Sequence, residues 1–262
     1  MGGRPLTPLV LTIGATDPWN AAGLGLDVGA LAACGARAVM VVAGVTAQDR
    51  SGVSRARAVD AGLIAAQFAS LGSAEIAAVR IGALLDVPSV AEVAMWLRTR
   101  RADGATVPVV YDPVLGPSGG GAFADDAALA VIVASLLPLV SLVTPNLTEA
   151  ARLTDSPVAT MPEAMVAQGR HLRSFGADAA LVTGGHLAGD PIDVYVAADG
   201  ERTFAAPRLA GTLRGTGCLL ACGIAAARAR GCAPLEAIER GRAFVRDRFV
   251  HATELGGMRV AY

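Results

Sequence analysis

The most informative absence in this sequence is lysine, because all 22 basic residues are arginine. A Walker-type phosphate loop needs a lysine on the β- and γ-phosphates, and a pyridoxal phosphate Schiff base needs a lysine amine, so both chemistries are excluded. The 22 basic residues stand against 23 acidic ones, which leaves a formal net charge of −1. A nucleic-acid-binding protein presents a basic field instead. We therefore expect small molecules, and no nucleic acid, as partners.

Cysteine, histidine and aromatic residues are also scarce. The four cysteines form no CxxC pair and the three histidines are scattered, which argues against a structural zinc site and indicates reduced thiols. Hydrophobic residues make up 53% of the chain but aromatic residues only 4%, so the core is expected to consist mainly of Ala, Val and Leu. This composition excludes a disordered or collagen-like chain.

No apolar run has the features of a membrane span or a signal peptide. The short apolar run near the N-terminus enters a Gly/Asp/Pro turn without a cleavage-like site, so it predicts a strand. The longest apolar stretch, Ala127 to Val143, is interrupted by Pro138 and fits a helix followed by a strand better than a span of about 20 residues. We expect a cytoplasmic protein with no membrane partner.

Strand-like runs alternate with Ala-rich helical segments, which predicts an α/β fold with a mostly parallel sheet and helices on both faces. The expected strands are residues 8–13, 38–45, 76–81, 107–111, 139–144 and 179–183, and a hairpin is expected from 192–196 and 202–206. The expected helices are residues 21–34, 61–71, 87–101, 125–137, 162–175, 216–230 and 234–248. No linker or repeat divides the chain, so a single domain over residues 1–262 is predicted.

Polar or Gly-rich clusters fall where several of these strands end. In parallel sheets, ligands bind beyond the carboxyl ends of the strands. The repeated position of these clusters predicts a binding site at that edge. The clusters are residues 14–18, 48–50, 112–114, 144–149 and 183–186.

The sharpest single motif is Gly215-Thr216-Gly217-Cys218, immediately before an Ala-rich helix. Two glycines let successive backbone N–H groups converge, and the helix N-terminus adds its positive end, so the motif can bind an anion without lysine. A Cys in the first turn would have its thiolate favoured by the helix dipole and could act as a base or nucleophile. The alternative is a tight turn with a small packed Cys.

Asn146 and Glu149 stand three residues apart at the start of a short helix after Thr-Pro. An amide and a carboxylate on one side suit Mg²⁺ coordination through waters beside a nucleotide. The same pair is also a variant of the helix capping box.

Three further features have open interpretations. Asp27, in a small and apolar helical segment, and Gln48, at the end of a strand, are candidate recognition groups for a polar heterocycle, or are exposed or satisfied polar residues. The loop at residues 116–121 is either a flexible connection or a lid over a ligand.

Seven segments, taken in order, resemble the hydroxymethylpyrimidine and phosphomethylpyrimidine kinases of thiamine biosynthesis, which belong to the ribokinase-like superfamily. The likeness extends from about residue 9 to about residue 250. The segments are Ala-Thr-Asp-Pro (15–18), Ala-Gly-Leu-Gly-Leu-Asp (22–27), Ala-Gln-Asp-Arg-Ser-Gly-Val (47–53), Asp-Pro-Val (112–114), Thr-Pro-Asn-Leu-Thr-Glu-Ala (144–150), Gly-Gly-His (184–186) and Gly-Thr-Gly-Cys (215–218).

The resemblance implies a ribokinase-like three-layer sandwich and two ATP-dependent phosphoryl transfers, the first to the hydroxymethyl oxygen of the aminopyrimidine and the second to its monophosphate. It implies that Cys218 activates the acceptor hydroxyl and that the amides of Gly215, Thr216, Gly217 and Cys218 form the anion hole. ATP and Mg²⁺ are the expected cofactors, and a homodimer is the expected assembly.

The resemblance also implies the residues that bind each substrate. Asp27 and Gln48 match positions that hydrogen-bond the pyrimidine. The other matches are Ala15, Ala83 and Val114 lining the pyrimidine pocket, Asn146 and Glu149 holding Mg²⁺ through waters, Asp112 beside them, and Thr183 on the nucleotide side.

Several residues depart from the family pattern. Trp19-Asn20-Ala21 replaces a Ser-Gly-Gly stretch and adds bulk beside the pyrimidine, whereas Ala83 replaces a Met and removes volume. Two family lysines are replaced, by Thr183 and Pro117, and Arg214 stands where the family commonly has His. Phosphate neutralisation would then fall to Mg²⁺, backbone amides and Arg214.

Two other functions fit parts of the pattern. A pyridoxal-type vitamin kinase shares the fold and the Gly-Thr-Gly element, but Asp27 and Gln48 favour a pyrimidine. A catalytically weakened pyrimidine-binding or regulatory protein would account for the lost lysines. The presence of Cys218, Asn146 and Glu149 favours an active kinase over that protein.

Overall fold

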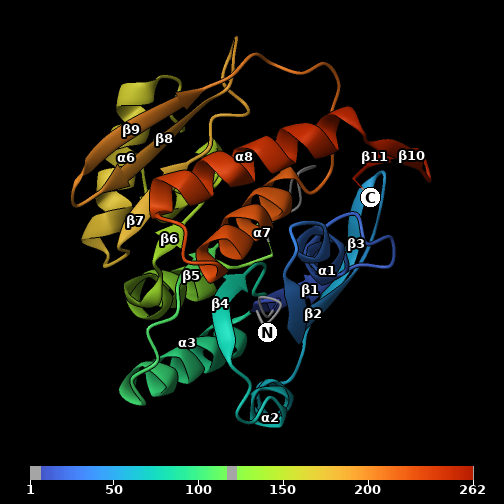
Figure 1. Ribbon diagram of the computed structural model, residues 1–262, viewed down its shortest axis with the longest axis vertical. Coiled ribbons are helices and arrows are strands. Elements are labelled where there is room, and N and C mark those ends of the chain that lie inside the picture. Colours follow the sequence, from blue (N-terminus) through green and yellow to red (C-terminus); the bar gives the residue numbers. More distant parts are fainter. Residues whose placement is uncertain (1–6, 117–122, 262) are drawn as a thin grey trace, which may run out of the picture.

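The computed structural model describes residues 7–116 and 123–261. Within these ranges, nine strands form one sheet in the order β3-β2-β1-β4-β5-β6-β7-β8-β9 (Figure 1). The strands are β1 (Leu9–Thr16), β2 (Arg37–Asp49), β3 (Gly52–Ala58), β4 (Ile76–Ile81), β5 (Val109–Tyr111), β6 (Leu142–Val143), β7 (Ala179–Val182), β8 (Ile192–Ala197) and β9 (Gly200–Ala205).

The centre of the sheet is parallel and its edges are antiparallel. Strands β2, β1, β4, β5, β6 and β7 pair in parallel, whereas β3 pairs antiparallel with β2, and β8 and β9 continue antiparallel from β7. This arrangement confirms the predicted α/β fold and places the carboxyl ends of six strands at one edge. Strand β3 was not predicted, because its Ser-Arg-Ala-Arg segment at residues 54–57 is exposed and lacks an apolar pattern.

Two groups of helices cover the two faces, so the molecule has three layers (Figure 1). Their apolar side chains belong to two separate buried clusters, as expected for a parallel sheet covered on both sides. One face carries α1 (Gly23–Ala33), α7 (Thr216–Ala229) and α8 (Pro234–Val250). The other carries α2 (Ala61–Ser70), α3 (Val87–Ala102), α4 (Asp126–Val131), α5 (Leu147–Leu153) and α6 (Pro162–Ser174).

The start of several helices follows from local capping. The Asp86 side chain accepts a hydrogen bond from the Ser89 N–H at 2.9 Å, and the Ser89 hydroxyl lies 3.4 Å from the Asp86 N–H, so α3 begins with a capping box. Asp60 is the N-cap of α2, where its side chain accepts a hydrogen bond from the Leu63 N–H. Helices α2 and α3 then pack side by side through Phe68 and Trp96, whose ring centroids lie 4.6 Å apart.

The predicted helix at residues 125–137 is broken. Regular α-helix ends with α4, a π-helical turn η1 (Ile132–Leu136) follows, and a 3₁₀ turn η2 (Leu137–Leu139) closes the segment. Pro138 lacks the N–H that would continue a helix, so the chain tightens and then turns into the sheet. The strand predicted at residues 139–144 is correspondingly reduced to β6.

A second, two-stranded sheet at the C-terminal end was not predicted. It consists of β10 (Thr253–Leu255) and β11 (Met258–Val260), and Met258 and Val260 pack with Ala21 in a small buried cluster. The hairpin therefore holds the loop between β1 and α1 in place. No helix within residues 7–116 and 123–261 combines the length and the apolar character needed to cross a membrane.

Candidate active site

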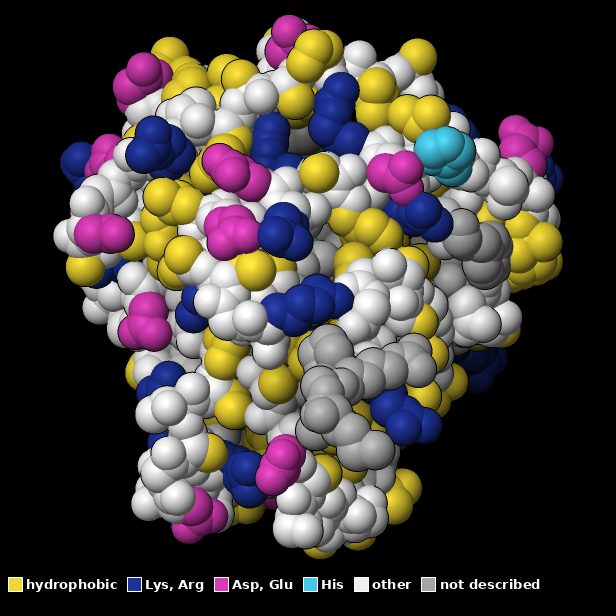
Figure 2. Space-filling model, viewed as in Figure 1, with side chains coloured by type: hydrophobic (Ala, Val, Ile, Leu, Met, Phe, Trp, Pro, Cys, Tyr) yellow, Lys and Arg dark blue, Asp and Glu magenta, His cyan; other side chains and the backbone are white. Residues whose placement is uncertain are grey.

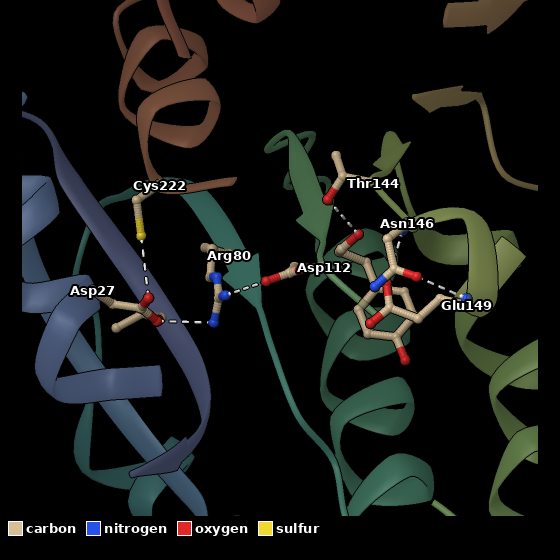
Figure 3. A network of polar contacts seen from close by, with 9 residues as sticks. Asp27, Arg80, Asp112, Thr144, Asn146, Glu149 and Cys222 are labelled. Atoms are coloured by element: carbon tan, nitrogen blue, oxygen red, sulfur yellow. Dashed lines mark hydrogen bonds and ion pairs between the residues drawn. The ribbon is translucent and has the colours of Figure 1, made fainter. Parts of the chain in front are cut away.

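The predicted site residues gather where the central strands end beneath the N-terminus of α7. The loop after β1, the ends of β4, β5 and β6, and the turn before α7 meet there. Figure 3 shows Asp27, Arg80 and Asp112 pointing toward one another beside a second polar group formed by Asn146 and Glu149. The sequence thus predicted the edge of the sheet, but not how these side chains are connected.

The turn before α7 is built around Gly215. Its φ of 75° is left-handed, and a Cβ there would stand 2.7 Å from the Ala21 carbonyl oxygen, so this position requires glycine. No side chain caps α7, and Gly217 is exposed at its first turn. Unpaired N–H groups and the positive end of a 14-residue helix therefore face outward from the turn, as an anion site requires.

Cys218 follows this turn but is buried, with 6% of its surface exposed. Burial raises the pKa of its thiol to about 12, and the nearby carboxylates of Asp112 and Asp27 act in the same direction, against the opposing effect of Arg80. The thiol also donates a hydrogen bond to Asp112. The expectation that the helix N-terminus favours a thiolate is therefore wrong for this structure, because desolvation and the neighbouring negative charges outweigh the helix dipole.

The surroundings of Asp27 also contradict the expectation that it hydrogen-bonds the pyrimidine. Its side chain is fully buried, and both carboxylate oxygens have donors within the protein: Thr12 Oγ1 at 2.5 Å and Arg80 at 2.9 Å to Oδ2, and the Cys222 thiol at 3.3 Å to Oδ1. The carboxylate has no surface exposed to a ligand, so a pyrimidine cannot form a direct hydrogen bond with it in this structure. Asp27 therefore lies beneath the site rather than in its wall.

Arg80 is the residue that sequence reasoning missed. Its guanidinium is 1% exposed and spans Asp27 and Asp112, with NH2 lying 2.7 Å from Asp112 Oδ2 (Figure 3). Burial raises the pKa of the Asp112 carboxyl. The positive charge of Arg80 opposes this increase, and the negative charge of Asp27 adds to the increase. The available signal was a charged residue inside the apolar run at 76–81, since an arginine in a buried strand needs a partner.

Asn146 and Glu149 form the capping box that was one of the two interpretations of their spacing. Asn146 Oδ1 accepts from the Thr148 and Glu149 N–H groups, both at 3.0 Å, and Glu149 Oε2 accepts from the Asn146 N–H at 2.8 Å. Burial raises the pKa of the Glu149 carboxyl to about 8, and repulsion by Asp112 contributes. The capping role and a magnesium role are compatible for Glu149, whose carboxylate keeps lone pairs beyond this bond. The two bonds at Asn146 Oδ1 use both lone pairs of that oxygen, so Asn146 has only its NH₂ group left to offer, as a donor.

Thr183 lies beside this pair, on the predicted nucleotide side. An isolated parallel bridge joins it to Asn146, and its N–H donates to the Pro145 carbonyl at 2.8 Å. The next residue, Gly184, donates its N–H to Asp193 at 3.0 Å, which fixes the start of the Gly-Gly-His segment. In the loop predicted as a lid or connection, residues 117–121 lie outside the described part of the chain.

The residues predicted to line the acceptor pocket lie at the ends of β1, β2, β4 and β5. Ala15 is buried, whereas Gln48, Ala83 and Val114 are half-buried. The parallel pairing of Ile13 with Ile81 brings the ends of β1 and β4 together, so that a Cβ on Gly14 would stand 3.5 Å from the Ala83 nitrogen. The structure therefore brings the end of β1 and Ala83 together at the edge where Arg80 and Asp112 lie.

Trp19, the bulky residue expected beside the acceptor, lies against the C-terminal hairpin. Its indole comes within 2.8 Å of where a Cβ on Gly256 would stand. Asp17 holds the preceding turn by accepting from the Trp19 and Ala22 N–H groups at 2.8 and 3.2 Å. Within residues 7–116 and 123–261, no group of three or more His, Cys, Asp or Glu side chains could hold a metal ion directly. Any Mg²⁺ at Asn146 and Glu149 would therefore depend on waters and phosphate oxygens.

Comparison with solved structures defines the class of fold. A phosphomethylpyrimidine kinase from Clostridium difficile superposes with a TM-score of 0.81 at 23% identity, covering 93% of this chain and 100% of that one. A pyridoxal kinase from Bacillus subtilis, solved as an ADP complex, gives 0.86 at 21% identity, covering 97% and 96%. This chain thus shares its three-layer fold with these two kinases.

Sequence comparison then narrows the class to one family. The phosphomethylpyrimidine kinase family model matches residues 17–261. A hydroxymethylpyrimidine/phosphomethylpyrimidine kinase from Salmonella typhimurium is 35% identical over 249 residues, which cover 94% of this chain and 92% of the relative. The chain belongs to the phosphomethylpyrimidine kinase family, and it is an enzyme that transfers a phosphoryl group.

Proposed function

We propose that this kinase transfers the γ-phosphoryl group of ATP to the hydroxymethyl oxygen of 4-amino-5-hydroxymethyl-2-methylpyrimidine, to the phosphate of the resulting monophosphate, or to both, in thiamine biosynthesis. The observation that carries the proposal is the uncapped N-terminus of α7 behind Gly215, with Asp112 facing it. Family membership supports the choice of a pyrimidine acceptor.

The residues present fit ATP and Mg²⁺. The N–H groups of Thr216, Gly217 and Cys218 lack side-chain caps and would hold phosphate oxygens, as a lysine-free site requires. Burial raises the pKa values of Asp112 and Glu149, and repulsion by Asp27 at Asp112 and by Asp112 at Glu149 adds to it, so a divalent cation nearby would relieve an unfavourable arrangement. Glu149 would hold Mg²⁺ through waters, and the ion would neutralise charge on the transferring group. The NH₂ group of Asn146 would donate to a phosphate oxygen beside the ion. Thr183 would contact the nucleotide.

Cys218 acts in this proposal as a neutral thiol. The acceptor oxygen attacks the γ-phosphorus, and the bond from that phosphorus to the bridging oxygen of ADP breaks. When the acceptor is a hydroxyl, its proton passes to the Asp112 carboxylate, whose Oδ1 faces the turn. The N–H groups at Gly215 to Cys218 stabilise the charge on the transferring oxygens, which is the larger part of catalysis in such a site. The thiol, held by Asp112, lies at this point and contacts the acceptor side of the group in transfer.

Gln48 is proposed to hydrogen-bond the pyrimidine, with Ala15, Ala83 and Val114 lining the pocket. Its side chain is half-buried at the end of β2, where the pairing with β3 is irregular between Ala47 and Gln48. Such an irregularity turns a strand end and re-aims the side chain beside it. Gln48 therefore replaces Asp27 as the principal polar recognition group.

The proposal is tested by coupled measurement of ADP release with Mg²⁺ and ATP, using hydroxymethylpyrimidine, its monophosphate and pyridoxal as acceptors. We expect release that depends on one or both pyrimidines and on Mg²⁺. ADP release with pyridoxal as the only active acceptor would show that the protein is a pyridoxal-type vitamin kinase instead. Binding of a pyrimidine without release would favour the regulatory protein.

We further propose a cytoplasmic homodimer with no nucleic-acid or membrane partner. Met40 and Val45 are 48% and 51% exposed on β2 beside the edge strand β3, where a second copy would cover them. Figure 2 shows Arg, Asp and Glu side chains interspersed over the face it views, which does not offer a field of one sign to a polyanion. Light scattering after gel filtration tests the dimer, and a monomeric mass at micromolar concentration would contradict it.

A further inference from the structure

The sheet face under α1 and α7 changes from apolar to polar toward the carboxyl ends of the strands. Side chains two residues apart share a face of a strand. On β1, β4 and β5 the apolar Val10, Ala78 and Val110 belong to the buried cluster beneath α7, and the next residues on that face are Thr12, Arg80 and Asp112. A buried polar layer therefore lies between the core and the N-terminus of α7.

Arg80 is the centre of this layer. Its two terminal nitrogens contact two different carboxylates, NH1 with Asp27 at 2.9 Å and NH2 with Asp112 at 2.7 Å (Figure 3). The guanidinium has room because residue 82 is glycine, where a Cβ would stand 2.2 Å from NH1. Thr12 and Cys222 hold the other sides of Asp27. Each end of the bridge is thus fixed by a different element of the fold.

The bridge selects which oxygen of Asp112 faces the turn. Arg80 takes Oδ2, and Oδ1 lies 3.3 Å from where a Cβ on Gly217 would stand, beside the N–H groups that begin α7. Buried ion pairs contribute little net stability, since desolvation offsets their attraction. Two carboxylates for one guanidinium are costlier still, so folding alone gives little reason for this arrangement.

We propose that Arg80 is a positioning residue for phosphoryl transfer, which holds one oxygen of Asp112 against the turn at Gly217, and that Asp27 acts through Arg80 instead of on the acceptor. This inference rests on the proposed kinase function. It assigns Arg80, Gly82 and Asp27 a common role in setting kcat, with little effect on the KM of either substrate.

Arg80→Lys provides the main test. A lysine ammonium keeps the positive charge but cannot reach both carboxylates in the fork geometry of a guanidinium. Loss of a catalytic alignment of this kind lowers kcat by about 10- to 100-fold. We expect such a fall, with the KM values for ATP and acceptor within about threefold of wild type. Gly82→Ala, which displaces the guanidinium, should have the same effect.

Asp27→Asn separates the two roles proposed for Asp27. If it acts through Arg80, kcat falls, and the double variant Asp27→Asn/Arg80→Lys is no slower than Arg80→Lys alone. If it binds the acceptor directly, the acceptor KM rises while kcat is kept, which would overturn the inference. Gln168→Met serves as a matched control for stability, because Gln168 is 4% exposed and hydrogen-bonded to Ser156 and Pro157 away from the site. It should lower the melting temperature and leave kcat unchanged.

A crystal structure of the Arg80→Lys variant makes the test independent of turnover. We expect the Asp112 carboxylate to leave its position against Gly217, and an unmoved carboxylate or an unchanged kcat would refute the positioning role. Failure of the wild-type enzyme to release ADP with any acceptor would refute the proposed function instead. Even then, the position of the Asp112 carboxylate in the Arg80→Lys crystal structure would show whether Arg80 holds it against the turn.

Discussion

Replacing Glu149 by glutamine is expected to flatten the dependence of stability on pH. Burial and the Asp112 charge raise the pKa of Glu149 from 4.5 to about 8, so the folded protein keeps a proton that the unfolded chain has lost at neutral pH. The stability that this proton contributes is fully present below the pKa of Glu149 in the unfolded chain. It is lost as the pH rises through the pKa of Glu149 in the folded protein. The free energy of unfolding therefore falls between about pH 4.5 and about pH 8.

The magnitude follows from proton linkage. One proton held only by the folded state changes the free energy of unfolding by up to about 1.4 kcal/mol per pH unit. From about pH 5.5 to about pH 7.5 the loss amounts to about 2.5 kcal/mol. At about 2 to 4 °C per kcal/mol for a chain of this size, the melting temperature should fall by about 5 to 10 °C.

Glutamine is a matched replacement, because the capping box accepts Glu or Gln at this position and the bond from the Asn146 N–H is kept. Thermal melts of wild type and Glu149→Gln across this pH range give the contribution of Glu149 as the difference between two curves. Parallel curves would show that Glu149 does not keep a proton in the folded protein. Mg²⁺ at about pH 7.5 should stabilise the wild type more than the variant, since the cation takes the place of the proton.

Three other substitutions test separate parts of the site. Cys218→Ala should lower kcat at least about tenfold with little change in melting temperature, and Cys218→Ser should recover part of the rate. A kcat for Cys218→Ala within about threefold of wild type in steady-state kinetics would contradict a catalytic role. Gln48→Ala should raise the acceptor KM about 5- to 150-fold and leave the ATP KM unchanged, whereas a change confined to ATP in the same assay would reverse the assignment of the two pockets. Gly215→Ala should destabilise the protein more than Gly72→Ala in urea unfolding, because both have left-handed φ but only at Gly215 would a Cβ meet neighbouring atoms; the left-handed conformation alone costs about 1 to 2 kcal/mol, and equal losses would show that the packing against Ala21 is unimportant.

The fold was largely predictable because most strands are buried and therefore appear in the sequence as short runs of apolar residues. The run at 76–81 was predicted as a strand and is found over the same residues, since a parallel strand covered on both faces is mostly apolar, here at every position except Arg80. Strand β3 and the C-terminal hairpin were missed because their stability comes from pairing with neighbours rather than from an apolar pattern of their own. Pro138 was recognised as an interruption, but the π-helical turn before it depends on tertiary packing.

The sequence predicted that the candidate site residues lie at one edge of the sheet, but not which side chains contact one another. The motif before α7 and the pair Asn146 and Glu149 could be placed by their spacing, since strand ends and helix starts fix where they lie. The protonation of Cys218 could not be predicted from the sequence, because it depends on burial and on Asp27 and Asp112, which approach the thiol only in the folded chain. The same holds for Arg80, whose two partners are 53 and 32 residues away in sequence.

Transfer to the pyrimidine is tested most directly by identifying the product by ³¹P NMR after incubation of the enzyme with hydroxymethylpyrimidine, ATP and Mg²⁺. We expect a phosphomonoester resonance that grows as ATP is consumed, and a diphosphate ester when the monophosphate is also an acceptor. ADP accompanied only by inorganic phosphate would contradict it, because the γ-phosphoryl group would then have passed to water and not to the pyrimidine.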